Sequence, residues 1–316
     1  MARIILENKL SVVVIIHYQT RKQTAGLKSG SAVFITREVF LPTAIVTDST
    51  SDIPASLLEE YNIFQVPTDL ILDNVTYLDG FDLSRNEFYD RLPTLENLPT
   101  TAAPSAGRFQ KIFEGIFCEG YTDIISIHAA SALSGIYNAA RLAAKEFSET
   151  IHVLDSEQLS LGLGFQVIEA ARGVRENLPL EEILRKVQSI QKRLHVFALL
   201  DTFTYIHRSG RVSWAKARLG SILNIKPIIE LKKGQVLNRG LARARGNGLR
   251  LLGEYLGKLG PLEQMAVLHT NAAEAGRDFI QHFSPPQIPD PFLVNVTTII
   301  GTHVGPNGIG FAAVVK

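Results

Sequence analysis

Cysteine is almost absent from this sequence, because Cys118 is the only one among 316 residues. A single thiol closes no disulfide within the chain and builds no cysteine-rich zinc site, which argues against a secreted protein framed by disulfides. An excess of one charge is missing too, since 32 basic residues balance 31 acidic ones. Such a chain lacks the basic footprint of a nucleic-acid-binding protein and the polybasic signature of one that binds anionic membranes.

A long apolar run is missing near the amino terminus. The run 12–16 is preceded by Glu7 and Asn8 and ended by His17. A signal peptide needs about 7 to 15 apolar residues and a membrane helix about 20. We therefore expect a cytoplasmic protein without stable membrane insertion. Hydrophobic residues make up 46% of the chain and charged residues 20%, which is ordinary globular composition and excludes intrinsic disorder.

Several common catalytic motifs do not occur. The sequence contains no G-x-S-x-G, no G-x-x-x-x-G-K-[ST], no H-E-x-x-H and no G-x-G-x-x-G after a strand. The nearest glycine pair, Gly162 and Gly164, begins an apolar helical stretch and is explained by packing. No two histidines have the spacing of metal ligands. We expect neither a metal nor a cofactor.

Residues 1–43 read as an amino-terminal extension, either an appended or partly disordered segment or a stable hairpin. Two β-rich runs, 10–18 and 31–40, flank the polar stretch 19–30. The pattern resembles a loose hairpin, although its connection is long for one. We assign no function to this region.

Strands and helices alternate over residues 44–195, which we assign to a first domain. Strands are predicted over 44–47, 64–72, 123–128 and 151–155, and helical segments over 53–61, 84–92, 101–114, 134–147, 162–176 and 180–193. Apolar strands alternating with helices predict an α/β domain with a parallel, Rossmann-like sheet covered on both faces.

Residues 196–316 read as a second domain of α+β class, because strands now follow one another closely. Strands are predicted over 196–201, 226–231, 235–242, 265–270, 292–300 and 309–315, and helices over 213–223 and 247–259.

Three polar loops lie where an open α/β sheet binds its ligand, beyond the carboxyl ends of strands. They are Asp-Ser-Thr-Ser-Asp at 48–52, Thr-Thr-Ala-Ala-Pro-Ser at 100–105 and Ala-Ala-Ser-Ala-Leu-Ser-Gly at 129–135. Hydroxyls and backbone amides at a helix start can hold a carboxylate or phosphate. Helix capping explains any one such loop alone, whereas several loops converging at one sheet edge indicate a binding site.

Histidine and arginine provide further candidates. His303 lies in the Gly-rich segment 301–310, predicted as a turn between two strands, where an imidazole can donate to an anion. The alternative is an ordinary loop or interior histidine. Basic clusters surround Arg211 (with His207, Arg208, Lys216 and Arg218) and Arg243 (with Arg239 and Arg245). These are either solvated surface groups or contacts for a docking partner or a phosphate.

Taken in order, these motifs resemble those of the DegV family of bacterial fatty-acid-binding proteins, from about Thr43 to the carboxyl terminus. The match is carried by AIVTDSTSDIP at 44–54, TAAPS at 101–105, SALSGIY at 131–137, RSGR at 208–211 and HVGPNG at 303–308. The resemblance implies a DegV-like fold with the ligand between the two domains.

The resemblance also implies a function and a site. The protein would bind one long-chain fatty acid and would not be an enzyme alone. It would present the acid to a separate ATP-dependent fatty-acid kinase, which forms an acyl phosphate for phospholipid synthesis. The implied carboxylate contacts are Thr101 and Ser131 with His303 beside them, supported by Ser105, Ser134 and Gly135. Arg211 and Arg243 match basic positions associated with the phosphorylated product or the docked kinase.

The sequence departs from the family pattern at Ala102, Ala130, Ile136, Ser209 and Asn307. Two other hypotheses use the same residues. One is a hydrolase or transferase with Ser105 or Ser131 as nucleophile and His303 as base, for which the sequence names no acidic partner. The other is a lipid-sensing regulator of other proteins.

Overall fold

The computed structural model describes residues 3–6, 12–15, 43–212, 214 and 225–316. Contacts divide the chain into two compact units, Met1–Pro42 and Thr43–Lys316. In the smaller unit, β1 (Arg3–Leu6) pairs antiparallel with β2 (Val12–Ile15). β2 lies within the predicted run 10–18, whereas β1 has no counterpart in the predictions. The predicted partner run 31–40 lies outside the described residues. The predicted division of the larger unit after residue 195 stays a prediction.

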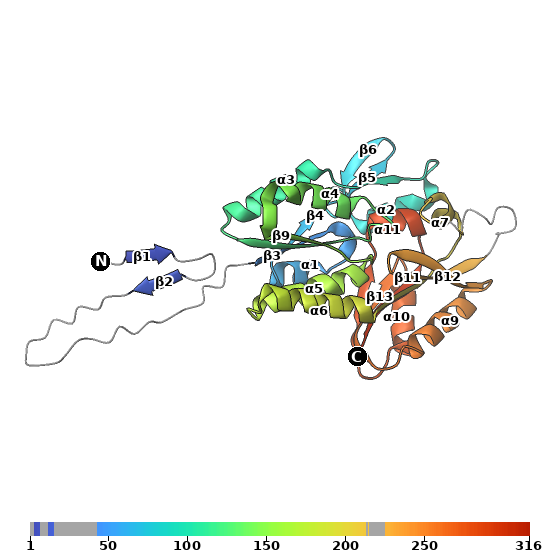
Figure 1. The fold of residues 1–316 in the computed structure, drawn as a ribbon. Coiled ribbons are helices and arrows are strands. Elements are labelled where there is room, and N and C mark those ends of the chain that lie inside the picture. Colours follow the sequence, from blue (N-terminus) through green and yellow to red (C-terminus); the bar gives the residue numbers. More distant parts are fainter. Residues whose placement is uncertain (1–2, 7–11, 16–42, 213, 215–224) are drawn as a thin grey trace, which may run out of the picture. The chain divides into compact units, whose positions relative to one another are not determined.

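A parallel sheet forms the first part of the larger unit (Figure 1). Its order is β4-β3-β8-β9, made of β3 (Thr43–Asp48), β4 (Ile63–Val66), β8 (Asp123–His128) and β9 (Ile151–Asp155). Ile45 and Ile125 pack into the core on one face, and Val46 and Ile124 into the core on the other. Strands buried on both faces are typical of parallel sheets. The predicted α/β class with a doubly covered parallel sheet is confirmed.

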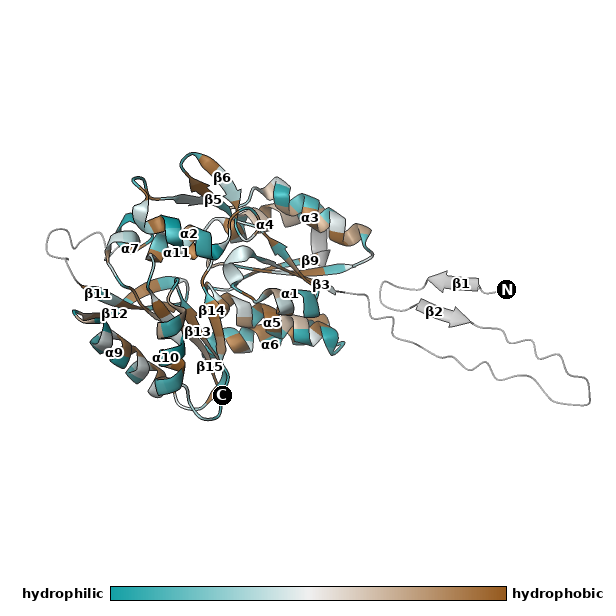
Figure 2. Cartoon of the chain, turned by 180° about the vertical axis from the view of Figure 1, so that it is seen from behind, coloured by the Kyte–Doolittle hydropathy of each residue, from teal (hydrophilic) through white to brown (hydrophobic). Residues whose placement is uncertain are grey.

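Helices cover both faces of this sheet. One face packs against α1 (Ala55–Glu60), α5 (Leu161–Arg175) and α6 (Leu180–Arg193), and the other against α3 (Ala106–Cys118) and α4 (Ile136–Ala144). On α6, Ile183, Val187 and Ile190 are the buried residues, and this spacing is that of one helix face. The helices accordingly show mixed hydrophilic and hydrophobic colouring (Figure 2). Short 3-10 turns occur at η1 (Ser49–Ser51) and η3 (Lys145–Thr150).

A small antiparallel sheet lies beside the parallel one and is missing from the sequence predictions. It contains β5 (Asp69–Leu72), β6 (Val75–Leu78) and β7 (Thr100–Ala102) in the order β6-β5-β7, with α2 (Arg85–Arg91) and η2 (Leu92–Thr94) between β6 and β7. The predicted single strand 64–72 is wrong, because the chain changes sheets at Pro67, which has no N–H for a strand ladder. The predicted helical segment 101–114 begins as strand β7, and its helix starts only at Ala106.

A six-stranded mixed sheet forms the second part, in the order β12-β11-β10-β15-β13-β14. Its strands are β10 (Leu194–Leu199), β11 (Lys226–Lys232), β12 (Gln235–Ala242), β13 (Leu262–His269), β14 (Phe292–Asn295) and β15 (Ile309–Val315). Only the β13–β14 pair is parallel within this sheet. Helices α9 (Arg245–Gly257) and α10 (Ala273–Phe283) pack on one face. The predicted α+β class of this part is confirmed.

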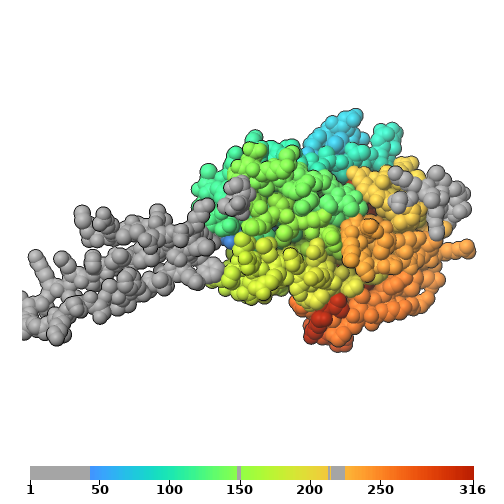
Figure 3. All heavy atoms as spheres, viewed as in Figure 1, coloured from blue at the N-terminus to red at the C-terminus, as the bar shows by residue number. Residues whose placement is uncertain are grey.

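The other face of the mixed sheet packs against α5 and α6. One hydrophobic core joins Ile125 of the parallel sheet, Phe165 of α5 and Val196 of the mixed sheet. The two sheets therefore share a helical layer. In the space-filling view the yellow-green atoms of the α5 and α6 region lie directly against the orange atoms of the second part (Figure 3).

One predicted strand in this part is wrong. The sequence predicts a strand over 292–300, but β14 ends at Asn295 and helix α11 (Thr298–Val304) follows. Thr297 caps this helix by accepting a hydrogen bond from the Ile299 amide. His303 therefore lies on a helix rather than in a turn between strands. The short helix α7 (Thr204–Arg208) precedes the predicted helix 213–223, of which only residue 214 is described.

Candidate functional site

A cavity of about 480 Å³ lies among the two sheets and α11. Its wall includes Thr50 and Ser131 from loops after parallel strands, Thr101 from β7, Leu231 from β11 and His303 from α11. The volume falls within the roughly 300–1,000 Å³ typical of small-molecule sites. Both parts of the larger unit contribute to the wall, as expected for a ligand held between them.

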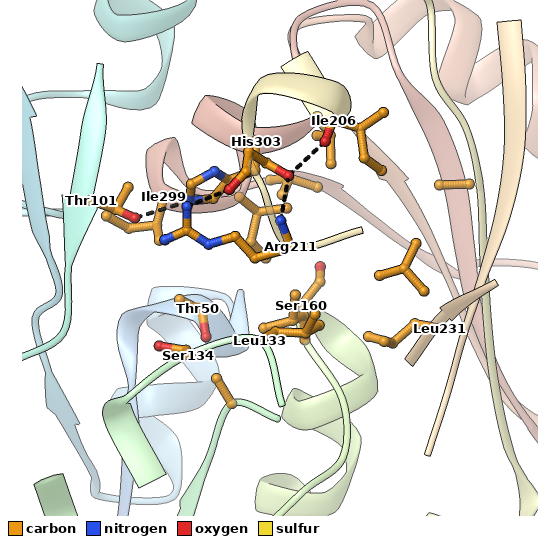
Figure 4. Close-up of a pocket in the computed structure, with 18 of the residues that line it drawn as sticks. Thr50, Thr101, Leu133, Ser134, Ser160, Ile206, Arg211, Leu231, Ile299 and His303 are labelled. Carbon is orange, nitrogen blue, oxygen red and sulfur yellow. Dashed lines mark hydrogen bonds between the residues drawn. The ribbon is translucent and has the colours of Figure 1, made fainter. Parts of the chain in front are cut away.

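One end of the cavity is polar. The Thr101 hydroxyl and the Nε2 atom of His303 are 2.9 Å apart and hydrogen-bonded (Figure 4). Burial and the nearby positive charge of Arg211 lower the pKa of His303 to about 4. The imidazole is therefore neutral at pH 7, with one nitrogen donating and the other accepting. This end thus offers neutral hydrogen-bonding groups to a ligand.

Arg211 also lines this end of the cavity. Its guanidinium donates to the Ser209 carbonyl oxygen at 2.6 Å, and the Ser209 hydroxyl donates to the Ile206 carbonyl at 2.7 Å. These two hydrogen bonds hold the segment 206–211 in a turn, and the exposed Arg211 lies near His303. A guanidinium here adds positive charge at the polar end without replacing the neutral groups.

Ser131 and Ser134 lie on the loop that follows β8, and both line the cavity. The Ser131 amide donates to the Asp155 carboxylate at 3.2 and 3.3 Å, so this amide is already engaged. The Ser134 hydroxyl accepts from the Ile136 amide at 3.4 Å, as a residue near a helix start does. Gly135 also lines the cavity, and a methyl group there would make only ordinary contact with Ala103, at 3.5 Å.

Two predicted residues do not line the cavity. Ser105 is exposed and caps α3 by accepting from the Arg108 amide at 3.2 Å. Arg243 is exposed between β12 and α9. The observed contact of Ser105 is that of a helix cap, and the supporting role of Ser105 and the docking role of Arg243 stay predictions.

The hydrolase hypothesis gains no support from these contacts. Within residues 43–212, 214 and 225–316, the hydrogen bond of the His303 side chain is to Thr101, and no ion pair joins it to a carboxylate. A serine nucleophile needs a base oriented by a third group. The Ser131–Asp155 contact uses a backbone amide and orients no base.

A buried Asp48–His128–Ser126 chain supports the cavity wall and was not predicted. The Asp48 carboxylate accepts from His128 Nδ1 at 3.0 Å and from the Ala129 amide at 3.1 Å, and His128 Nε2 lies 2.6 Å from the Ser126 hydroxyl. All three side chains are fully buried and none lines the cavity. The carboxylate also accepts from the Thr50 amide at 3.0 Å. It therefore fixes two loops that do line the cavity.

The rest of the cavity wall is mainly apolar. Its side chains come from both sheets and from the loops and helices beside them: Leu133, Leu159, Val196, Leu200, Ile206, Ile229, Leu231, Ile299 and Val304. Burying apolar ligand surface here contributes about 25 cal/mol per Å². A polar end with neutral hydroxyls, an imidazole and one guanidinium beside an apolar chamber suits an amphiphilic ligand.

Comparison with known proteins identifies the family of this chain. The sequence model of the DegV family, described as an uncharacterised protein, matches residues 42–316, and the chain belongs to the DegV family. A DegV domain-containing protein of Listeria innocua is 31% identical over 280 residues, covering 86% of this chain and 98% of that protein. One from Staphylococcus aureus is 30% identical over 277 residues, with the same coverage of 86% and 98%.

Solved structures share the fold. A DegV family protein of Thermus thermophilus, described for its fatty acid binding, has a TM-score of 0.80 and 27% identity, covering 87% of this chain and 100% of that one. DegV of Bacillus subtilis, described as a fatty acid binding protein, has a TM-score of 0.76 and 28% identity, with coverage of 87% and 100%. The predicted membership of the family is confirmed.

None of the helices in the described parts of the chain has the length and apolar character needed to cross a membrane.

Proposed function

We propose that this protein binds a long-chain fatty acid, with the carboxylate at the polar end and the acyl chain in the apolar part of the cavity. The observation that carries the proposal is the Thr101–His303 pair, 2.9 Å apart, at one end of an apolar chamber. The fatty-acid-binding descriptions of the relatives from Thermus thermophilus and Bacillus subtilis support it.

The polar groups suit a carboxylate that must remain reactive. The Ser131 hydroxyl, and the one O–H or N–H that the mutual hydrogen bond of Thr101 and His303 leaves free, can donate to a carboxylate without forming an ion pair. A carboxylate buried against a paired arginine would lose nucleophilicity, because its charge would be neutralised by a bidentate contact. Arg211 lies at the same end but is exposed, so solvent weakens any ion pair that it forms with the head group. The arrangement favours binding that orients the acid and leaves an oxygen available.

The second part of the proposal is the fate of the bound acid. We propose that the protein presents the carboxylate to a separate ATP-dependent fatty-acid kinase in the cytoplasm. A carboxylate oxygen would attack the γ-phosphorus of ATP, ADP would leave, and the acyl phosphate would serve phospholipid synthesis. Arg211, exposed beside the head group, suits contact with the new phosphate, and the exposed Arg243 suits contact with the kinase. The chain itself then acts as a carrier without catalysing the transfer.

A two-stage experiment tests the two parts separately. Isothermal titration of the delipidated protein with palmitate is expected to show saturable binding of one molecule per chain. Addition of a purified fatty-acid kinase and ATP is then expected to yield acyl phosphate, trapped with hydroxylamine. Absence of binding contradicts the first part. Binding without acyl phosphate contradicts only the second.

A further inference from the structure

Asp52 is not part of the cavity wall, yet its carboxylate joins three segments that form it. One oxygen accepts from the Thr297 amide at 2.8 Å and lies 3.0 Å from the Arg85 guanidinium, and the other accepts from the Ser160 hydroxyl at 2.6 Å. Asp52 ends the first polar loop, Ser160 precedes α5 and Thr297 caps α11. A single buried side chain therefore connects positions separated by as many as 245 residues.

Ser160 has a backbone conformation that glycine normally occupies. Its φ is 52° and its ψ is −146°, and a residue with a side chain held there costs roughly 1–3 kcal/mol in strain. The strain is maintained by two contacts, the hydroxyl donating to Asp52 and the amide donating to the Thr50 carbonyl at 2.8 Å. Ser160 also lines the cavity. A serine here is useful because it supplies the hydroxyl that reaches Asp52.

The start of α11 is held by a second carboxylate as well. Asp79 is buried and accepts from the Thr297 hydroxyl at 2.5 Å and from the Thr298 hydroxyl at 2.6 Å. The Tyr89 hydroxyl donates to the Val296 carbonyl at 3.0 Å. His303 lies six positions after Thr297, or about 9 Å along a helix at 1.5 Å per residue. Displacement of the helix start therefore moves His303.

We propose that Asp52 positions the head-group end of the cavity, holding His303 opposite Thr101 by tying the start of α11 to Ser160 and to the first polar loop. Asp79 holds the start of α11 by accepting from the hydroxyls of Thr297 and Thr298, but it has no hydrogen bond to Ser160. Asp52 joins the start of α11 to the Ser160 segment. The positioning role rests on the proposed function in one respect, because fatty-acid binding is the readout that tests it.

The charge of Asp52 makes this role measurable. Burial raises the pKa of Asp52 to about 6, opposed by Arg85 and by the hydrogen bonds from Ser160 and Thr297 and assisted by Asp79. The titratable groups that face it are Arg85, Asp79 and Tyr89. At pH 7.5 the carboxylate accepts from all three donors. Below pH 6 it is mostly protonated and neutral, so its hydrogen bonds from Thr297 and Ser160 and its contact with Arg85 lose their charge assistance and the tie to α11 weakens.

Stability and affinity should then respond to pH in opposite directions. Since the pKa of Asp52 is raised from its ordinary value of 3.8 to about 6 in the folded protein, the folded protein holds a proton between pH 6 and 4 that the unfolded chain does not yet bind. The contribution of Asp52 to stability therefore increases as pH falls, while ligand affinity decreases. A purely structural role would make the two change together.

The first experiment compares wild type and Asp52→Asn in palmitate titrations at pH 7.5 and 5.5, with Asp278→Asn, an exposed surface change on α10, as control. We expect Asp52→Asn to bind roughly tenfold more weakly at pH 7.5, as loss of a charged hydrogen bond predicts. The wild type should weaken more than this variant between the two pH values. Equal affinity of wild type and Asp52→Asn at both pH values would overturn the proposal.

A second variant covers the case in which Asp52→Asn does not fold. Ser160→Gly removes the strain and the hydroxyl together, so we expect little change in stability, because the two effects offset each other, with severalfold weaker palmitate binding. Binding as tight as wild type would overturn the proposal. If the wild type binds no palmitate, the proposed function fails. The His303 imidazole resonances of Ser160→Gly then decide the positioning role, since a shift supports it and unchanged resonances refute it.

Discussion

Thr101 and His303 meet at 2.9 Å although 202 residues separate them in the chain. Thr101 lies on the short strand β7 of the small sheet, and His303 lies near the end of α11. Neither element was predicted in that form, yet both residues were predicted for the same head group. The polar end of the cavity is thus assembled by folding from two distant segments.

Thr101→Val should weaken palmitate binding about tenfold, because a hydrogen bond to a charged group contributes roughly 1.5–3 kcal/mol. Valine preserves the shape of the side chain, so the fold should be retained. Isothermal titration measures the effect. The exposed neighbour Thr100→Val is the matched control and should bind as the wild type does. Equal binding by both variants would remove Thr101 from the site.

Ser131→Ala separates a carrier from a hydrolase. For a carrier we expect palmitate affinity to fall only severalfold, since one of several hydrogen bonds is lost. A nucleophilic serine would instead lose turnover by orders of magnitude. The measurement is palmitate titration beside hydrolysis of a long-chain p-nitrophenyl ester. Ester turnover by the wild type that disappears in Ser131→Ala would favour the hydrolase.

Chain length should set affinity through the apolar part of the cavity. Each methylene buried contributes about 0.8 kcal/mol, so two methylenes should tighten binding about tenfold or more. Titration with saturated acids of increasing length should show this slope and then a plateau where the cavity is filled. Affinity independent of chain length would place the acyl chain elsewhere.

Gly301→Ala should distort α11. A Cβ atom there would lie 2.4 Å from the Tyr89 hydroxyl oxygen and 2.7 Å from its Cζ atom. Tyr89 is buried, so the helix must shift, and we expect lower stability, by about 1–3 kcal/mol, together with weaker palmitate binding. Gly257→Ala on α9 is the control, because nothing lies within 4 Å of its Cβ position. Urea unfolding should show the control unchanged or slightly stabilised.

The pH dependence of stability should include a contribution from His303. Its pKa in the folded protein is lowered to about 4, by burial first and by Arg211 second. As pH falls from about 6.5 to 4, the unfolded chain takes up a proton that folded His303 does not, so stability decreases. His303→Gln should reduce this slope in urea unfolding at several pH values. The exposed His282→Gln is the control, and an unchanged slope in His303→Gln would contradict the lowered pKa.

Features of the fold that depend on neighbouring residues in the chain were predicted from the sequence. Apolar strands alternating with helices predicted the parallel sheet, and the resemblance to the DegV family implied Ser131 and Thr101, which both line the same cavity. Two failures share a cause in tertiary contacts. The run 64–72 changes sheets at Pro67, and α11 forms where β-branched residues favour a strand.

The supporting network was beyond sequence reasoning for a similar reason. Asp52 meets Thr297 and Asp48 meets His128 across 245 and 80 residues. No spacing rule connects such positions, because their distance is set by the stacking of whole elements. Neighbouring parallel strands that end in Asp48 and His128 are the one signal that could have suggested their contact.

The most direct test of the account is native mass spectrometry of the protein as purified, followed by solvent extraction and identification of what is released. We predict one fatty acid per chain, retained in the wild type and depleted in Thr101→Val. A protein that carries no lipid and takes up none when fatty acids are added would contradict the account.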